Sequence, residues 1–332
     1  MGKYNVYGIG NALVDMEFAV EDSFLKNNNI EKGLMTLIDE ERHHELFRTL
    51  KSFHGKKACG GSAANTIIAV TQFGGKSYYS CKVASDDTGT FFLDDLKKCG
   101  VTTNLGDERE NGVTGKCLVM VTPDADRTMN TFLGITEEVS PNELDEDAIR
   151  NSEYVYLEGY LVTSPTGRAA AIAARKIAEK AGVKTALTFS DPNMVEFFKD
   201  GLTEMLGKKV NLLFCNKDEA TQWAGSSDLN KAVESIQEVA DTFAITLGDK
   251  GALVFDGEQL HNIAPTATSA VDTNGAGDMF AGAFLYAITH GYTYPQAGEL
   301  ASIAAAKVVS QFGPRLSKEE QSEALAAYTT TS

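Results

Sequence analysis

The stretch Val271-Asp272-Thr273-Asn274-Gly275-Ala276-Gly277-Asp278 joins a run of small residues to the start of a long amphipathic segment. This pattern predicts a loop that opens into the N-terminus of a helix. Backbone N–H groups at a helix start have no partner within the helix, and the helix dipole adds positive potential, so the stretch predicts an anion site. The small side chains of Gly275, Ala276 and Gly277 would let phosphate oxygens approach the backbone.

Asp278 falls in the first turn of the predicted helix and faces the same anion. A carboxylate beside a phosphate is unfavourable unless it has a task, and the obvious task is to accept a proton from a hydroxyl that attacks phosphorus. The alternative is an ordinary helix-start acid, which the helix dipole favours. The stretch alone leaves both interpretations open.

Short β-branched runs alternate with amphipathic stretches over most of the 332 residues. This alternation predicts βαβ units and an α/β fold with a mostly parallel sheet and helices on both faces. The expected strands are Val6–Ile9, Ser77–Lys82, Tyr154–Leu157, Thr185–Phe189, Asn211–Cys215 and Phe243–Leu247. The expected helices are Ser62–Phe73, Gly89–Cys99, Gly167–Ala181 and Asn193–Leu206, with two more between Gly275 and Gln311.

Two regions, about 16–38 and 101–133, interrupt the alternation with short extended pieces and few helical signals. Gly115–Val121 and Thr128–Leu133 look like strands outside the βαβ pattern. Small strands inserted in this way predict a lid over one edge of the sheet. No Pro-, Gly- or Ser-rich linker and no repeat divides the chain, so residues 1–332 are expected to form one domain with this lid.

Other nucleotide-binding motifs fit the sequence less well. A dinucleotide fingerprint at Gly8-Ile9-Gly10 needs Gly or Ala where Leu13 stands, which leaves an NAD-dependent oxidoreductase as a distant alternative. A P-loop that ends at Gly75-Lys76-Ser77 needs an earlier glycine where Val70 stands. Neither pattern competes with Asp272–Asp278.

The formal net charge of −16 describes an acidic protein, and no stretch of the sequence gathers a basic stripe. These features exclude nucleic acid and anionic membranes as expected partners.

The five cysteines form no Cys-x-x-Cys pair, which indicates a reducing compartment. The five histidines have no metal-ligand spacing. Without signal features or an 18-residue apolar run, a cytoplasmic location is expected. A small-molecule substrate remains, and both monomer and homodimer stay open.

The stretch Asp272–Asp278 resembles the C-terminal signature of the PfkB, or ribokinase-like, carbohydrate kinase family. Four further matches extend the resemblance in order over essentially the whole chain: Gly10-Asn11 with Asp15, Gly60-Gly61-Ser62-Ala63-Ala64-Asn65, Asn216-Lys217-Asp218-Glu219 and Thr246-Leu247-Gly248-Asp249-Lys250-Gly251. The resemblance implies a ribokinase-like, three-layer α/β/α, doubly wound fold with a small inserted β lid. It also implies an ATP-dependent phosphotransferase with an alcohol acceptor.

The resemblance further implies roles for individual residues. Asp278 would be the general base, and Gly275, Ala276 and Gly277 would stabilise charge on the transferred phosphoryl group. The substrate-binding residues would be Asn11, Asp15, Met35, Gly60, Gly61, Ser62, Asn65, Arg127 and Tyr160. The ATP-binding residues would be Asn216, Glu219, Thr246, Gly248, Gly251 and Thr273, with Asn216 and Glu219 acting on Mg²⁺ through water. K⁺ is a further candidate, because many members bind it near the Asp-Thr step and a Gly-x-Arg turn, here Gly313-Pro314-Arg315.

Several of these residues also have a purely structural interpretation. Asn216 and Glu219 match a helix cap with an early-turn acid, and Gly60-Gly61-Ser62 matches a turn with an N-cap. Met and Tyr residues such as Met35 and Tyr160 are common in protein cores. A lone arginine is commonly a surface residue, which is the alternative for Arg127.

Within the family, the Gly60–Asn65 and Asp272–Asp278 segments resemble adenosine kinases more than fructose-phosphate kinases. Tyr160 aligns with an aromatic residue that stacks on the base, whereas Asn193 stands where eukaryotic adenosine kinases carry a second aromatic residue. The expected reaction is phosphorylation of the 5′-hydroxyl of a nucleoside, adenosine first. A kinase for ribose or a related pentose or hexose is the alternative. A ligand sensor of kinase fold is a third hypothesis, against which the intact Asp278 argues.

Overall fold

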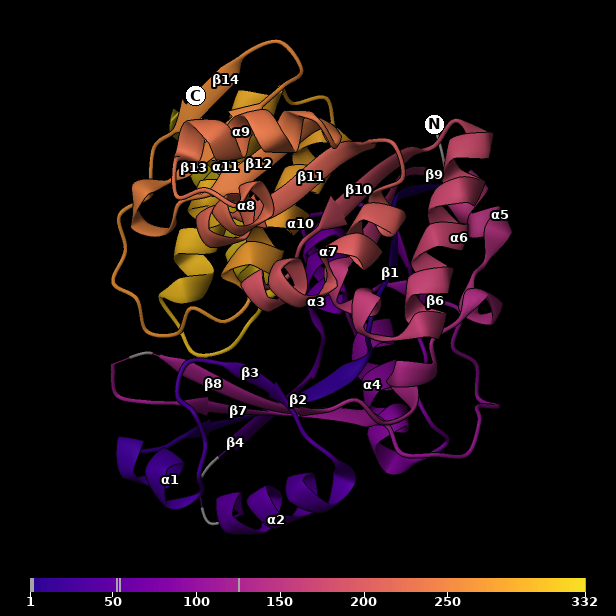
Figure 1. The fold of residues 1–332 in the computed structure, drawn as a ribbon, viewed down its shortest axis with the longest axis vertical. Helices are drawn as coiled ribbons and strands as arrows, with labels where there is room; N and C mark the ends of the chain where they lie inside the picture. Colours follow the sequence, from indigo (N-terminus) through magenta and orange to yellow (C-terminus); the bar gives the residue numbers. More distant parts are fainter. Residues whose placement is uncertain (1–2, 52, 54, 125, 332) are drawn as a thin grey trace.

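A nine-stranded sheet forms the centre of the computed structural model, which describes residues 3–331 apart from 52, 54 and 125 (Figure 1). The strand order is β14-β13-β12-β11-β10-β9-β1-β5-β6. All neighbouring strands from β12 to β6 pair in parallel, and β13 and β14 add an antiparallel edge. The bounds are β1 Tyr4–Ile9, β5 Ser77–Ser80, β6 Thr102–Thr103, β9 Ser152–Glu158, β10 Lys184–Thr188, β11 Val210–Asn216, β12 Ala240–Thr246, β13 Ala252–Phe255 and β14 Leu260–Ile263.

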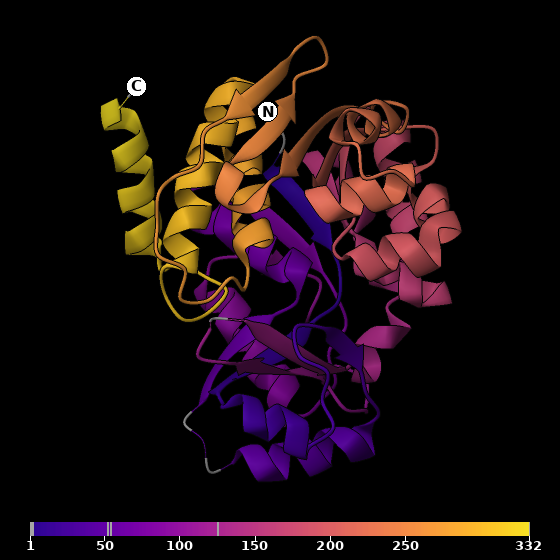
Figure 2. The same cartoon turned by 60° about the vertical axis from the view of Figure 1, so that its left-hand side comes forward.

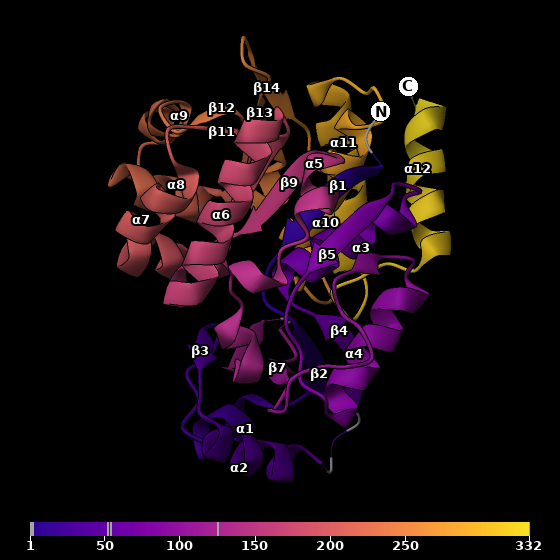
Figure 3. The ribbon, with the colours of Figure 1, turned by 90° about the vertical axis from the view of Figure 1, so that its right-hand side faces the viewer.

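Helices cover both faces of this sheet, so the large part of the molecule has three layers (Figure 3). One face carries α3 (Ser62–Gln72), α10 (Ala276–Ile288) and α11 (Tyr294–Val309), and α12 (Lys318–Thr331) lies outside them (Figure 2). The other face carries α5 (Glu146–Arg150), α6 (Pro165–Ala181), α7 (Pro192–Leu206), α8 (Lys217–Ala224) and α9 (Leu229–Gln237). Short 3₁₀ turns join the layers at Gly134–Glu138, Pro141–Glu143, Gly159–Thr163 and Gly248–Lys250.

Successive strand residues enter two different hydrophobic cores. Val6 and Tyr156 join the core beneath α3 and α10, whereas Tyr7 and Leu157 join the core beneath α6 and α7. Neighbouring residues of a strand point to opposite faces, so both faces of a parallel sheet need apolar residues. This requirement explains why the strands of the sequence are short apolar runs without clear alternation.

A second, five-stranded sheet lies beyond the carboxyl end of β1, in the order β3-β8-β7-β2-β4 (Figure 1). We refer to it as the small sheet. Its strands are β2 Leu13–Ala19, β3 Met35–Leu37, β4 Gly55–Gly60, β7 Gly115–Val121 and β8 Arg127–Phe132. The helices α1 (Asp22–Asn27) and α2 (Glu40–Leu50) cover its outer face, and α4 (Asp87–Lys98) packs against β2 and β4.

The expected strands and helices of the βαβ pattern are present, with ends that differ by a few residues. The prediction for the two irregular regions was wrong in part. Within 16–38, Asp22–Asn27 is helical, and within 101–133, Thr102–Thr103 pairs with β5 of the large sheet. Gly55–Gly60 was not predicted as a strand, and it pairs with β2 in the small sheet. The C-terminal part also contains a third helix, α12.

The strand order reverses between β1 and β9. From β1 the chain builds outward through β5 and β6, and from β9 it builds in the opposite direction through β10, β11 and β12. Such a reversal opens a crevice at the carboxyl ends of the two strands, where doubly wound proteins bind ligands. Asn11 follows β1 and Glu158 ends β9, so both lie at this point. In the described residues, no helix combines the length and the apolar character needed to span a membrane.

His43 on α2 is buried, and neither ring nitrogen has a hydrogen-bond partner among the described residues. Burial, then the Lys116 and His44 charges, lower the pKa of His43 to about 4. Because this value lies below the ordinary value of 6.5, protonation favours the unfolded chain, and the free energy of unfolding should fall as the pH drops from 6.5 towards 4. A shift of this size corresponds to about 3 kcal/mol at most.

His43→Leu should remove this pH dependence, measured by urea unfolding at pH 7 and at pH 4. His44→Leu removes only the smallest of the three causes of the shift and should keep most of the wild-type dependence. An identical loss of stability at low pH in wild type and His43→Leu would contradict the assignment.

Candidate active site

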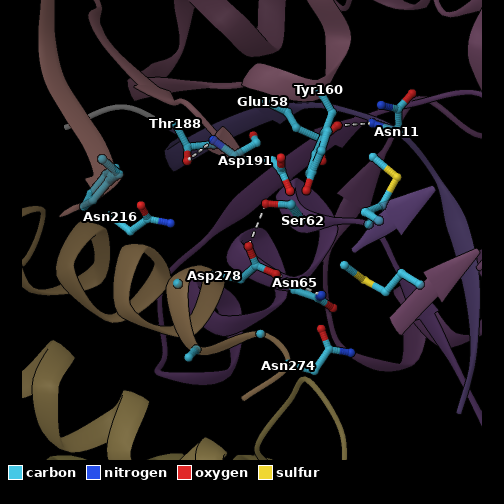
Figure 4. A pocket seen from close by; sticks show the side chains of 18 of the residues that line it. Asn11, Ser62, Asn65, Glu158, Tyr160, Thr188, Asp191, Asn216, Asn274 and Asp278 are labelled. Atoms are coloured by element: carbon cyan, nitrogen blue, oxygen red, sulfur yellow. Dashed lines mark hydrogen bonds between the residues drawn. The ribbon is translucent and has the colours of Figure 1, made fainter. Parts of the chain in front are cut away.

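A cavity of about 340 Å³ lies between the carboxyl ends of the large-sheet strands and the small sheet (Figure 4). Its lining comes from the β1–β2 connection, the start of α3, the ends of β9 to β12, four small-sheet strands (β2, β3, β7 and β8) and the loop into α10. The predicted site residues that line it are Asn11, Asp15, Met35, Gly61, Ser62, Asn65, Arg127, Tyr160, Asn216, Glu219, Thr246, Thr273, Gly275, Ala276, Gly277 and Asp278. Segments up to 267 positions apart in sequence, from Asn11 to Asp278, therefore meet at one place.

Three predicted residues, Gly60, Gly248 and Gly251, do not line this cavity. Gly60 lies directly behind it, because a Cβ at Gly60 would collide with the Asp15 carboxylate. Gly248 is exposed in a turn after β12, and Gly251 has a φ of +89°. A Cβ at Gly251 would also collide with the Ile263 carbonyl, so this glycine is needed for the turn itself.

Asp278, in the first turn of α10, faces the start of α3. The Ser62 hydroxyl donates to its Oδ1 at 2.6 Å, and Asn65 Nδ2 donates to its Oδ2 at 3.1 Å (Figure 4). Burial raises the pKa of Asp278 above its ordinary value, and these two hydrogen bonds act against that rise. Both donors stabilise the ionised carboxylate, which is the form that can accept a proton.

The loop before Asp278 leaves open space at the helix start. Gly275 is the N-cap of α10 with a φ of +72°, and a Cβ there would collide with the Pro314 carbonyl. At Gly277, by contrast, an ideal Cβ would meet no atom within 4 Å. The first helical turn therefore offers backbone N–H groups beside empty volume, which suits a phosphate group.

Asp272 fixes the other end of this loop. Its side chain has 0% of its surface exposed and accepts hydrogen bonds from the Asn274 N–H at 2.9 Å and the Gly313 N–H at 3.0 Å. The loop is thus tied to the segment that follows α11.

Glu158 is a cavity residue that the sequence analysis did not predict. It has no exposed surface, and its carboxylate accepts from the Asn11 N–H at 2.6 Å and the Ala63 N–H at 3.0 Å. Burial raises the pKa of Glu158 to about 7, the two amides lower it, and Asp278 adds to the rise. Its position at the carboxyl end of a central strand was the signal that could have identified it.

Arg127, on β8, connects the small sheet to the loop before α10 and is not a surface arginine. Its Nη1 donates to Asn274 Oδ1 at 2.7 Å, and its Nε lies 3.2 Å from Asp272 Oδ1. Asn274 was quoted within the motif but was not predicted as a site residue, because its partner is 147 positions away. Nearby, burial and then Glu17 raise the pKa of Asp15 to about 7.

Asn216 and Glu219 form a capping box at the start of α8. Asn216 Oδ1 accepts from the Glu219 N–H at 2.8 Å, and Glu219 Oε2 accepts from the Asn216 N–H at 3.0 Å. The capping interpretation is therefore correct, and both side chains also line the cavity. Burial raises the pKa of Glu219 to about 8, although the hydrogen bond from the Asn216 N–H acts against that rise. Among the described residues, no group of three or more His, Cys, Asp or Glu side chains is placed to hold a metal ion.

The remaining walls are apolar or aromatic. Met35 and Met129 are paired across β3 and β8, and Tyr160 follows β9. The Tyr160 hydroxyl faces the Asp191 carboxylate. Burial raises the pKa of Asp191 above its ordinary value, and the hydrogen bonds from Asn193 and Tyr160 act against that rise. Asp191 is a second cavity residue that the sequence analysis did not assign. A flat group whose faces are apolar and whose edges are polar would fit between such walls.

Known proteins resemble this chain over most of its length. The family model described as pfkB family carbohydrate kinase matches residues 33–321. A solved structure of a probable sugar kinase from Rhizobium etli CFN 42 is 33% identical with a TM-score of 0.92, over 99% of this chain and 100% of that one. An adenosine kinase from Sinorhizobium meliloti is 34% identical with a TM-score of 0.91, over 99% of both chains. The adenosine kinase of Saccharomyces cerevisiae is 26% identical over 94% of this chain and 96% of that protein.

These relatives confirm the predicted ribokinase-like α/β fold, with its mostly parallel sheet between layers of helices. The family match also displaces the NAD-dependent oxidoreductase as an explanation of the cavity. This chain belongs to the pfkB family of carbohydrate kinases and is a phosphotransferase that acts on an alcohol group of a sugar or a nucleoside.

Proposed function

We propose that this kinase phosphorylates the 5′-hydroxyl of a nucleoside, with adenosine as the first candidate. The observation that carries the proposal is the Asp278 carboxylate, held by Ser62 at 2.6 Å and Asn65 at 3.1 Å beside the open space at Gly277. Two relatives named as adenosine kinases support the choice of a nucleoside, one of them 34% identical. In this proposal the whole chain is one kinase domain, in which the small sheet acts as the lid.

The acceptor would lie between the small sheet and α3. Asn11, Asp15 and Asn65 are buried polar residues that line this end of the cavity. Asn65 Oδ1 has no hydrogen-bond partner among the described residues, so it can accept a hydrogen bond from a hydroxyl. A ribose with vicinal hydroxyls would satisfy these groups, while Gly61 allows its ring to approach the backbone. The apolar walls at Met35 and Tyr160 would then hold the base.

The phosphate donor would occupy the other end. Membership of a kinase family implies ATP as the co-substrate. In Figure 4, Asn216 lies on the far side of Asp278 from Asn11, which supports a donor on the Asn216 side. Thr246 and Thr273 line the same cavity, and Gly248 and Gly251 are proposed to contact the donor beyond it.

Asp278 would accept the proton of the acceptor hydroxyl as that oxygen attacks phosphorus. The first turn of α10, from Gly275 to Gly277, would stabilise the charge that develops on the phosphoryl oxygens. ATP would supply the phosphoryl group and Mg²⁺ would neutralise part of its charge. Asn216 and Glu219 would contact waters of the ion, since Mg²⁺ retains much of its hydration. Arg127 would turn from Asn274 towards phosphate.

A turnover assay with a panel of acceptors tests this proposal. Purified protein, Mg-ATP, and K⁺ or Na⁺ as the alternative salts would be incubated with adenosine, inosine, ribose or fructose, and ADP release would be followed. The highest kcat/KM is expected for adenosine, and dependence on K⁺ would support K⁺ as a cofactor. Turnover of ribose or fructose with no turnover of adenosine would favour the sugar-kinase alternative. Asn193 in place of a second aromatic residue and the Asp191 carboxylate support that alternative.

Ser62→Ala should shift the acidic limb of the pH–kcat/KM profile. The Ser62 hydroxyl lowers the pKa of Asp278, so its loss should raise that pKa and move the limb to higher pH, by about one unit for a hydrogen bond to a charged group. Thr163→Val removes a cavity hydroxyl that bonds to the Tyr160 carbonyl instead, and it should leave the limb in place. An unshifted limb in Ser62→Ala would argue against Asp278 as the titrating base.

A further inference from the structure

The ion pair between Asp95 and Arg315 lies outside the residues that line the cavity and has no part in the reaction steps described above. Arg315 Nη2 donates to Asp95 Oδ2 at 2.8 Å, and only 15% and 22% of the two side-chain surfaces are exposed. Arg315 Nη1 also donates to Cys59 Sγ at 3.3 Å. A charge left unpaired at this depth is costly, so the positions of the two side chains are strongly coupled.

On one side, the pair holds the strand that leads into the substrate-binding glycines. Asp95 Oδ2 also accepts a hydrogen bond from the Cys59 N–H at 2.9 Å. Cys59 lies on β4 directly before Gly60, which leaves room for the Asp15 carboxylate. The chain then continues into α3, which carries both hydrogen-bond donors to Asp278. Asp95 therefore anchors the acceptor side of the site.

On the other side, Arg315 ends the turn that supports the phosphate loop. The Gly313 N–H donates to Asp272 Oδ2 at 3.0 Å. The Pro314 carbonyl lies so close to Gly275 that a Cβ at Gly275 would collide with it. Any displacement of the turn would thus be passed to the N-terminus of α10.

We infer that the Asp95–Arg315 pair is a positioning element that fixes the spacing between β4 and the loop into α10. The inference rests on the proposed roles of this loop and Asp278, but it does not depend on which acceptor is used. A hydroxyl held from β4 and α3 must meet phosphorus held by the loop, and a misplacement of about 1 Å can cost about 10²-fold in rate. The pair should therefore act on kcat more than on KM.

The ionisation of the pair fits this role. Burial would raise the pKa of Asp95, but the Arg315 guanidinium and the hydrogen bonds from Cys59 hold that pKa below its ordinary value. Both members of the pair consequently stay charged at neutral pH, and their attraction holds the two side chains in place.

The test compares three variants, Arg315→Met, Asp95→Asn and the double variant Asp95→Asn/Arg315→Met. Arg315→Met leaves the Asp95 carboxylate without its cation and should lower the melting temperature. The double variant removes both charges, keeps an amide oxygen for the Cys59 N–H, and should recover most of the stability. Its kcat should nevertheless stay about 30- to 100-fold below wild type, with KM within about threefold.

Hydrogen exchange supplies a readout that does not require turnover. Peptides covering 58–65 and 272–280 should exchange faster in the double variant, while peptides of α6 should be unchanged. Lys307→Met is the matched control, because it removes the ion pair with Glu323 between α11 and α12, and it should leave kcat and both peptides unaffected.

Recovery of kcat together with stability in the double variant would overturn the inference, because the pair would then be only a fold contact. The inference would also be overturned if, in the double variant, the peptides 58–65 and 272–280 exchanged hydrogen at the wild-type rate. If wild-type protein phosphorylates no acceptor at all, the proposed function fails, and the exchange of the two peptides still decides whether the pair holds the two segments.

Discussion

Asp278→Asn should lower kcat by about 10³-fold, within the range of about 10² to 10⁴ typical for a general base, while KM for both substrates changes little. The physical reason is that an amide cannot accept the hydroxyl proton. The shape of the site should survive, because Asn retains an oxygen for the Ser62 hydroxyl. Asn65 can also rotate its amide towards the new side chain, since its Oδ1 has no other partner among the described residues.

Steady-state kinetics with saturating ATP and acceptor measure this effect, and thermal unfolding checks that the variant is folded. Asp87→Asn is the matched control, because Asp87 is also an acid in the first turn of a helix but is exposed on α4. It should keep wild-type kcat. An Asp278→Asn enzyme with more than about a tenth of wild-type kcat would leave general-base catalysis by this carboxylate without support.

Gly277→Ala should make the protein slightly more stable and much less active. Gly277 is the second residue of α10, where replacing Gly by Ala stabilises a protein by about 0.4–1 kcal/mol if the backbone suits both, and its Cβ would meet no atom within 4 Å. That empty volume is where the phosphoryl group is proposed to lie. A methyl group there should lower kcat by about 10² to 10³, comparable with the loss of one donor to a developing charge.

Gly275→Ala is the matched comparison and should behave differently. Its φ of +72° and the Pro314 carbonyl make any Cβ unfavourable, so both stability and activity should fall. Melting temperatures and kcat of the two variants measured together separate the two glycines. Full activity in Gly277→Ala would exclude phosphate binding at this helix start.

Much of the fold could be predicted because the central strands and helices carry their own local patterns. Tyr154–Leu157 is an apolar run of the kind needed where both faces are covered. Gly55–Gly60 could not be recognised, since a segment with two glycines and two lysines has weak strand propensity and becomes a strand only by pairing with β2. Asp22–Asn27 was missed because a helix of six residues gives almost no periodic signal.

The site divides in the same way. The position of Gly275–Asp278 at a helix start could be predicted because it depends on neighbouring residues of one segment. Glu158 could not, because its role depends on two amides, at Asn11 and Ala63, that only the folded chain brings to it. Arg127 was identified from the family resemblance alone, and its contact with Asn274 depends on how the small sheet meets the loop.

The most direct test of the account is the identity of the product. Wild-type protein with adenosine and Mg-ATP would be followed by ³¹P nuclear magnetic resonance, with Asp278→Asn run in parallel. The account predicts that adenosine 5′-monophosphate and ADP appear in equal amounts with wild type, and that neither accumulates at a comparable rate with Asp278→Asn. Release of ADP without a phosphorylated nucleoside, or equal product formation by Asp278→Asn, would contradict it.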